Sequence, residues 1–186
     1  MDPDHVIEMC HLADAAATHD LGRRLAARLL LSRGEVAAKP TALEEPHSSS
    51  WVSGPSAASG YRLLLLRGEL GAGKTCLVQG LAEGLGIPDA VTSPSFALAH
   101  HYRGQQGAVA TALVHLDLYR LEQPAAADDL FAQEDEEARQ LGAVLAVEWP
   151  ERLSFLPEPC WWLELELAGS GRQARLGQAG VPSGSR

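Results

Sequence analysis

Runs of apolar residues along the chain predict strands that alternate with helices. Leu63 to Leu66 is an unbroken apolar run, which is typical of a strand buried on both faces of a parallel sheet. The next predicted element is a helix from about Lys74 to Leu85, after which glycines and then Pro88 end the helical pattern. Ala112 to Tyr119 and Gly142 to Trp149 are also apolar, and both are expected to be strands.

In the flanking segments, apolar residues recur with two different spacings, one helical and one strand-like. Leu12 to Leu31 predicts an amphipathic helix, capped by Thr18 or Asp20, because apolar residues recur every three or four positions at Leu21, Leu25, Ala26 and Leu29. Trp161 to Leu167 ends in an alternation of polar and apolar residues, which predicts a half-exposed strand near a sheet edge. Arg172 to Leu176 is expected to pair with it as a hairpin.

Three segments have weaker patterns. Ser32 to Gly60 is rich in proline and serine, and is expected to be a flexible insertion; the alternative is a folded accessory element around Trp51. Phe96 to His101 is a candidate strand, with a turn following it over residues 102–107. Residues 177–186 are expected to be frayed.

Length and composition favour a single domain over residues 1–186, because 186 residues that are 46% apolar suffice for one full core. The three cysteines, Cys10, Cys76 and Cys160, are widely spaced and predict neither disulfides nor a zinc site. The sequence has no apolar run long enough for a membrane span, and Met1 to Leu12 resembles neither a secretory signal nor a transit peptide. A cytoplasmic protein without membrane contact is therefore expected.

The charge of the chain argues against extensive nucleic-acid binding. Its formal net charge is −9 and its pI about 5.2, whereas binding to a phosphate backbone needs clustered lysine and arginine. Any contact with RNA is expected to be indirect. The acidic run Glu134 to Glu137 is interpreted as a solvated helix face, with a partner-docking surface as the alternative. His100, His101 and Cys76 are expected to have packing or surface roles.

The strongest chemical signal is G-x-x-x-x-G-K-T, from Gly68 to Thr75, between the first apolar strand and the helix that follows it. Glycines let the backbone turn tightly so that its N–H groups, together with the positive end of the helix dipole, can bind a polyphosphate. Lys74 would bring a positive charge to the β and γ phosphates, and the Thr75 hydroxyl is a candidate Mg²⁺ ligand. The pattern predicts a phosphate-binding loop.

Two acids follow apolar strands and are candidates for the same site. Asp117 and Glu148 each come near the end of a predicted strand, and the carboxyl ends of parallel strands meet beside a phosphate loop. The alternative is that each acid only caps its strand at the surface. The Ser93, Pro94, Ser95 turn is either a loop that senses the γ phosphate or Mg²⁺, or a simple turn.

Several motifs in one order resemble the bacterial TsaE family: GELGAGKT, TSPSF, HLDLYRL and VEWPERL, with ATHDLG upstream and GRQARL downstream. This family comprises small P-loop ATPases needed for N6-threonylcarbamoyladenosine (t6A) modification of tRNAs that read codons beginning with A. The resemblance covers roughly Leu12 to Leu31 and Tyr61 to Leu176. The expected fold is a three-layer α/β fold of the P-loop NTPase type, with a mostly parallel sheet flanked by antiparallel strands.

Carried over by position, the resemblance implies ATP phosphates on Leu70, Gly71, Ala72, Gly73, Lys74 and Thr75. Thr18 would approach the nucleotide, and Arg172 or Arg175 falls in a stretch that would close over it. Mg²⁺ would be held by Thr75, Glu148 and Asp117, and the catalytic residues would be Asp117, Glu148 and Lys74. How the two acids divide metal binding and water activation stays open.

By resemblance, the chain is expected to be an Mg²⁺-dependent ATPase, slow on its own, that binds a TsaB–TsaD heterodimer in an ATP-dependent way and resets it. A small-molecule P-loop kinase and a nucleotide-gated binding module with negligible hydrolysis are the alternatives. The chain departs from the family's pattern in three places, at the insertion Ser32 to Gly60, at Cys76, which replaces a hydroxyl residue, and in the long acidic segment Ala125 to Gln140. These departures concern partner contacts more than ATP binding.

Overall fold

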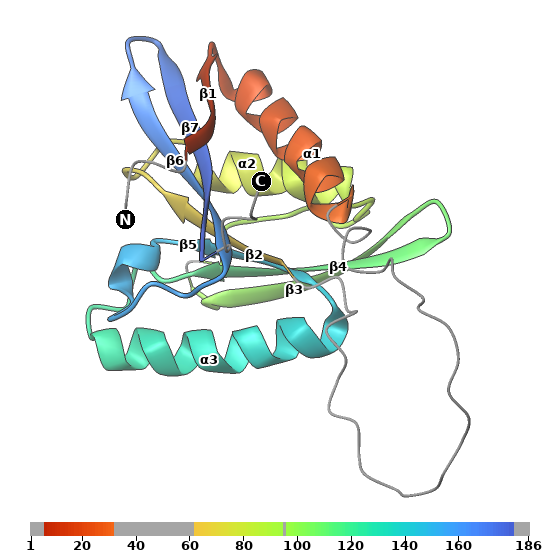
Figure 1. Cartoon of the computed structure of the whole chain (residues 1–186), viewed down its shortest axis with the longest axis vertical. Helices are drawn as coiled ribbons and strands as arrows, with labels where there is room; N and C mark the ends of the chain where they lie inside the picture. Colours follow the sequence, from red (N-terminus) through yellow and green to blue (C-terminus); the bar gives the residue numbers. More distant parts are fainter. Residues whose placement is uncertain (1–5, 32–61, 95, 181–186) are drawn as a thin grey trace, which may run out of the picture.

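The computed structural model describes residues 6–31, 62–94 and 96–180, so the expected insertion at 32–60 lies outside the described residues. Within these ranges, one mixed sheet lies between two helical layers: α1 and α2 cover one face and α3 covers the other (Figure 1). The helices are α1 (Ala15–Leu31), α2 (Lys74–Gly84) and α3 (Pro124–Leu141), with a short 3-10 turn η2 (Pro150–Arg152). Among the described helices, none has the length and apolar character that a membrane crossing requires.

The sheet has four parallel strands at its centre and antiparallel strands on both sides. Its order is β1-β7-β6-β2-β5-β4-β3. The bounds are β1 (Val6–Leu12), β2 (Arg62–Arg67), β3 (Ala99–Gln106), β4 (Val109–Asp117), β5 (Val144–Glu148), β6 (Cys160–Ala168) and β7 (Gly171–Ala179). β6, β2, β5 and β4 pair in parallel, whereas β3, β7 and β1 pair antiparallel with their neighbours. The expected three-layer α/β fold is confirmed.

The apolar run of β2 is buried on both faces. Leu64 and Leu66 pack into the core under α1 and α2, while Leu63 and Leu65 pack into the core against α3. All four side chains are at most 4% exposed. Burying a leucine contributes roughly 1.5–3 kcal/mol. This strand therefore holds both layers together and carries the loop at its end.

The first helix begins later than the sequence predicted. Leu12 belongs to β1, because it pairs with Arg172 at the start of β7. Asp14 caps the helix by accepting a hydrogen bond from the Ala17 N–H at 2.8 Å. Thr18, expected as a possible cap, lies inside the helix, and its hydroxyl donates to the Asp14 carbonyl at 3.1 Å. A strand that finds its partner about 160 residues away in sequence leaves no local signal.

Three other boundaries differ from the predictions. β3 starts at Ala99 and runs through the predicted turn to Gln106, because every residue of this stretch pairs with β4. β6 is not near an edge, since it lies between β2 and β7. Gly177 to Ala179 are not frayed but form the end of β7, opposite the start of β6. Residues 181–186 of that tail lie outside the described residues.

Helices α1 and α2 pack so closely that their backbones are in contact at two glycines. A Cβ atom placed on Gly80 of α2 would lie 1.8 Å from the His19 carbonyl oxygen, and one on Gly22 of α1 would lie 2.1 Å from the Leu77 carbonyl oxygen. Only glycine allows this approach. As a consequence, α1 brings Thr18 against the back of the loop that precedes α2.

Candidate active site

The segment between β2 and α2 forms a glycine-dependent loop. Gly68, Gly71 and Gly73 have φ values of 133°, 83° and 107°, a region that other residues rarely adopt. Gly73 is the N-cap of α2 and has no side chain to cap the first turn, so the N–H groups there are available to an anion. The backbone thus supports the predicted phosphate-binding loop.

Lys74 is held inside this loop. Its ammonium donates to the carbonyl oxygens of Gly68 at 2.7 Å and Glu69 at 3.1 Å, and lies 4.0 Å from the centre of the Trp149 ring. The residue is only 4% exposed. Burial lowers the pKa of Lys74 below its ordinary value, while the nearby acids Glu148, Glu151 and Asp117 act in the opposite direction.

The two candidate acids lie side by side at the carboxyl ends of adjacent parallel strands. Asp117 ends β4 and Glu148 ends β5, and the two are partners in the register of the sheet. Each is 3% exposed, so neither is a surface cap. The Thr75 hydroxyl donates to Glu148 Oε1 at 2.9 Å. Asp117 accepts hydrogen bonds from the Ser93 hydroxyl at 3.1 Å and the Tyr119 N–H at 3.0 Å.

These residues surround one pocket of about 220 Å³. Its lining combines the loop, the two acids, the predicted turn and an aromatic pair, and comprises Leu70, Gly71, Gly73, Lys74, Thr75, Cys76, Ser93, Asp117, Tyr119, Glu148 and Trp149. Two candidates do not line it. Ala72 is fully buried, and Thr18 is buried behind the loop, near Gly73. The structure therefore places Thr18 as a support of the loop.

The C-terminal hairpin reaches the loop through Arg172. Its Nε donates to the Ala72 carbonyl oxygen at 3.1 Å. Arg175, the other candidate from this stretch, is paired instead with Glu164 and Glu166 on β6. Of the two arginines that the resemblance singled out, the structure brings only Arg172 to the phosphate loop.

The donor set of the pocket suits Mg²⁺. The Thr75 hydroxyl and the carboxylates of Asp117 and Glu148 are hard oxygen ligands, which is what magnesium prefers. Cys76 also lines the pocket, but its thiol is engaged elsewhere, because it donates to the Ala15 carbonyl oxygen at 3.3 Å. The residues present therefore fit the metal that the sequence predicted.

Two residues of the site, Tyr119 and His115, were not predicted from the sequence. The Tyr119 ring packs on Trp149, with 4.9 Å between ring centres, and Trp149 itself has a left-handed backbone with φ of 62°. His115 bonds Glu148 from inside the sheet at 2.8 Å. Its signal in the sequence is its position two residues before Asp117, which puts both side chains on the same face of a strand.

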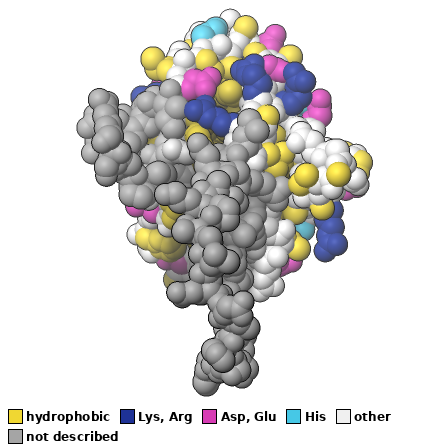
Figure 2. Space-filling model, turned by 45° about the vertical axis from the view of Figure 1, so that its right-hand side comes forward, with side chains coloured by type: hydrophobic (Ala, Val, Ile, Leu, Met, Phe, Trp, Pro, Cys, Tyr) yellow, Lys and Arg dark blue, Asp and Glu magenta, His cyan; other side chains and the backbone are white. Residues whose placement is uncertain are grey.

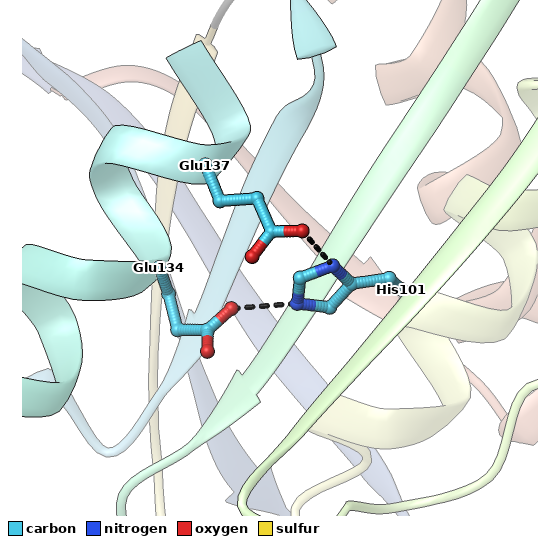
Figure 3. A group of neighbouring side chains, drawn as sticks. All are labelled: His101, Glu134 and Glu137. Atoms are coloured by element: carbon cyan, nitrogen blue, oxygen red, sulfur yellow. Dashed lines mark hydrogen bonds and ion pairs between the residues drawn. The ribbon is translucent and has the colours of Figure 1, made fainter. Parts of the chain in front are cut away.

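A second polar group lies outside this pocket, between β3 and α3. His101 Nε2 is 2.6 Å from Glu134 and its Nδ1 is 3.1 Å from Glu137 (Figure 3). The carboxylates face different ring nitrogens, so a hydrogen bond to Glu134 and an ion-pair contact with Glu137 account for the arrangement. Glu134 is 5% exposed. The acidic run is therefore not wholly the solvated face that its sequence predicted.

The fold and the loop define an α/β protein of the P-loop NTPase type. The chain belongs to the TsaE family, because the family model described as "Threonylcarbamoyl adenosine biosynthesis protein TsaE" matches residues 12–175. The resemblance found in the sequence motifs is thereby confirmed.

Curated relatives carry the name "tRNA threonylcarbamoyladenosine biosynthesis protein TsaE". The protein of Synechocystis sp. is 47% identical over 97 residues, which are 51% of this chain and 58% of that protein. The protein of Treponema pallidum is 39% identical over 112 residues, 60% of this chain and 77% of that protein. The crystal structure of YdiB from Bacillus subtilis is similar in fold, with a TM-score of 0.56 and 24% identity, over 94% of this chain and 86% of that one.

Proposed function

We propose that this chain is an Mg²⁺-dependent ATPase that serves t6A modification of tRNA. Its membership of the TsaE family and the names of its relatives support the pathway. The observation that carries the enzymatic part is the convergence of Lys74, Thr75, Asp117 and Glu148 on one pocket. These residues come from a loop, a helix and two strands, and they supply the groups that ATP hydrolysis needs.

The mechanism follows from the position of each group. The loop N–H groups and Lys74 bind the phosphates of ATP, and Lys74 exchanges its two carbonyl partners for phosphate oxygens. Magnesium, when bound, neutralises charge on the β and γ phosphates. The Thr75 hydroxyl keeps its proton directed at Glu148 Oε1, which leaves its oxygen free to ligate the metal. A carboxylate of the pair Asp117 and Glu148 orients the attacking water.

The proposal includes ATP-dependent binding and resetting of a TsaB–TsaD heterodimer. Two large apolar side chains are exposed in or close in sequence to segments that line the pocket: Leu70 is 71% exposed and Phe96 is 88% exposed. Leu70 is part of the phosphate loop, and Phe96 follows the Ser93 turn. A protein partner that covers these side chains would respond to the nucleotide, because both belong to segments that line the pocket.

Contact with tRNA is proposed to be indirect. On the face seen in Figure 2, basic and acidic side chains are interspersed rather than gathered into a patch of one sign. On α1, both Arg23 and Arg24 pair with Asp20, and Arg28 pairs with Glu8 at 3.0 Å. Arginines that are neutralised by neighbours contribute little to binding a phosphate backbone.

The test combines ATP hydrolysis with capture of a purified TsaB–TsaD pair, in the presence and absence of Mg·ATP. The variants are Lys74→Ala and Glu148→Gln, and the matched control is Glu136→Gln on the exposed side of α3. Wild type and control are expected to hydrolyse ATP and to capture the pair only with Mg·ATP. Both site variants are expected to lose hydrolysis.

Three results would contradict parts of the proposal. ATP binding without capture of the pair would remove the partner assignment. Transfer of phosphate to a nucleoside or sugar acceptor would favour a kinase instead. Full capture and release by Glu148→Gln, with nucleotide binding intact and hydrolysis absent, would make the chain a nucleotide-gated binding module.

A further inference from the structure

His115 lies near the carboxyl end of β4, two residues before Asp117, and is fully buried. Its Nε2 is 2.8 Å from Glu148 Oε1, on the neighbouring strand. Its Nδ1 is also buried and has no hydrogen-bond partner within the described residues. One nitrogen of this buried imidazole bonds a carboxylate, and the other has no partner within the described residues. Packing alone does not explain such an arrangement.

The chemistry of the pair assigns the proton. An ionised carboxylate only accepts hydrogen bonds, so the short contact requires a proton on Nε2 of His115. Nδ1 is then left as a bare acceptor, which is less costly than a buried N–H without a partner. The His115 ring therefore acts as a hydrogen-bond donor to Glu148 through Nε2–H.

This donor completes the hydrogen bonding of one carboxylate oxygen. Glu148 Oε1 accepts from the Thr75 hydroxyl at 2.9 Å and from His115 at 2.8 Å. A carboxylate oxygen has two acceptor positions, so Oε1 is fully used. Because Glu148 is only 3% exposed, these two donors, from α2 and β4, fix the orientation of its carboxylate. Oε2 is the oxygen that remains for the metal shell or the attacking water.

We propose that His115 is a positioning residue of the magnesium site. It acts through Glu148: its Nε2–H holds the carboxylate in the orientation that both accepts from Thr75 and presents Oε2 to the pocket. The inference rests on the proposed ATPase function for its role, but its geometry depends only on the three contacting residues. Donors to the ligands of a metal are typically worth about 10–100-fold in metal affinity or activity.

The test measures metal binding separately from hydrolysis. Mn²⁺, a paramagnetic substitute for Mg²⁺, is titrated into the complex of the protein with ADP and followed by electron paramagnetic resonance. His115→Phe keeps a ring of similar shape and removes the donor, whereas His115→Gln keeps an N–H. We expect about 10-fold weaker Mn²⁺ binding for His115→Phe, with recovery in His115→Gln. ADP affinity in excess chelator is expected to stay within about 2-fold of wild type, because loop and Lys74 are unchanged.

The matched control is His100→Gln. His100 is opposite His115 in the register of β3 and β4, yet it bonds Tyr102 and not Glu148. The His100→Gln variant is expected to bind Mn²⁺ with the same affinity as the wild type. In a Glu148→Gln background, His115→Phe is expected to have little further effect on Mn²⁺ affinity, since the carboxylate through which it acts is gone.

Either of two outcomes would overturn the inference: unchanged Mn²⁺ affinity in folded His115→Phe, or equal losses in His115→Phe and His115→Gln. If His115→Phe does not fold, nitrogen NMR of the wild-type ring decides, because a proton on Nδ1 instead of Nε2 contradicts the assignment. If the wild type binds Mn²⁺·ADP but does not hydrolyse ATP, the ATPase proposal is contradicted, whereas the positioning role of His115 is not.

Discussion

The Thr75 hydroxyl donates a hydrogen bond to Glu148 Oε1 at 2.9 Å, across 73 residues of sequence. This bond joins the first turn of α2 to the end of β5, and so couples the phosphate loop to the acids of the sheet. In the proposed function the oxygen of this same hydroxyl would ligate Mg²⁺, so Thr75 would serve both the metal and the carboxylate.

Replacing Thr75 by Ala is therefore expected to lower Mg²⁺-dependent ATP hydrolysis by about 10–100-fold, because both the hydroxyl ligand and the donor to Glu148 are lost. Thr75→Ser keeps the hydroxyl and should retain most of the activity. Hydrolysis rates as a function of Mg²⁺ concentration check this. Equal rates for the Ala and Ser variants would mean that the hydroxyl is not used.

The affinity for ATP is expected to fall as the pH rises. This fall should occur at a pH below 10.5, the ordinary pKa of a lysine side chain. Burial lowers the pKa of Lys74, and the protonated form is the one that attracts phosphate. Binding is thus strongest below the lowered pKa and is lost as the pH passes through it. Calorimetric affinities between about pH 7 and 10 test this, and Lys74→Met should show weak affinity with a flatter profile. A wild-type profile as flat as that of the variant contradicts the assignment.

Gly80→Ala is expected to destabilise the fold by about 1–3 kcal/mol or more, because the added methyl group would meet the His19 carbonyl oxygen at 1.8 Å. The backbones of α1 and α2 must then separate. Denaturant unfolding measures the effect, with Glu83→Ala, an exposed position on the same helix, as the control. An unchanged free energy of unfolding for Gly80→Ala would show that the two helices do not pack this closely.

His101→Ala is expected to lower the free energy of unfolding by about 1–3 kcal/mol, because it leaves the buried Glu134 carboxylate without its 2.6 Å partner. Replacing Glu134 by Met in that background removes the unpaired carboxylate, and part of the loss should be recovered. Glu137→Gln, at the exposed end of the group, should change stability by less than about 1 kcal/mol. If Glu134→Met costs the same with and without His101, the two residues are not coupled.

Cys160 is expected to make the fold less stable in alkali. Burial, assisted by Glu158, raises the pKa of the Cys160 thiol to about 11, from an ordinary value of 9.0. The unfolded chain therefore loses this proton first. The resulting stabilisation of the folded state is fully present below about pH 9 and is lost as the pH rises towards 11. The difference amounts to about 2–3 kcal/mol.

Denaturant unfolding of wild type and Cys160→Ala at a series of alkaline pH values isolates this contribution, since other groups titrate alike in both proteins. The wild type should lose stability more steeply than the variant over this range. Parallel curves would show that the thiol does not stay protonated when folded.

Much of the fold was predictable because its signals are local. The run Leu63 to Leu66 predicts a doubly buried strand, and both cores confirm it. The strand β1 and the interior position of β6 were not predictable, since each depends on pairing with a distant segment. Glu134 looked like part of a solvated acidic run, and only the approach of β3 to α3 buries it under His101.

The sequence by itself predicted the phosphate-binding loop, because Gly68, Gly73, Lys74 and Thr75 lie within one short segment and their backbone preferences are local. It also placed Asp117 and Glu148 at the ends of strands. Only the tertiary structure decided that Glu148 shares Oε1 with Thr75 and His115, and that Arg172 reaches Ala72 across 100 residues. Such contacts depend on strand order and register, which arise from packing of the whole chain and not from any single segment.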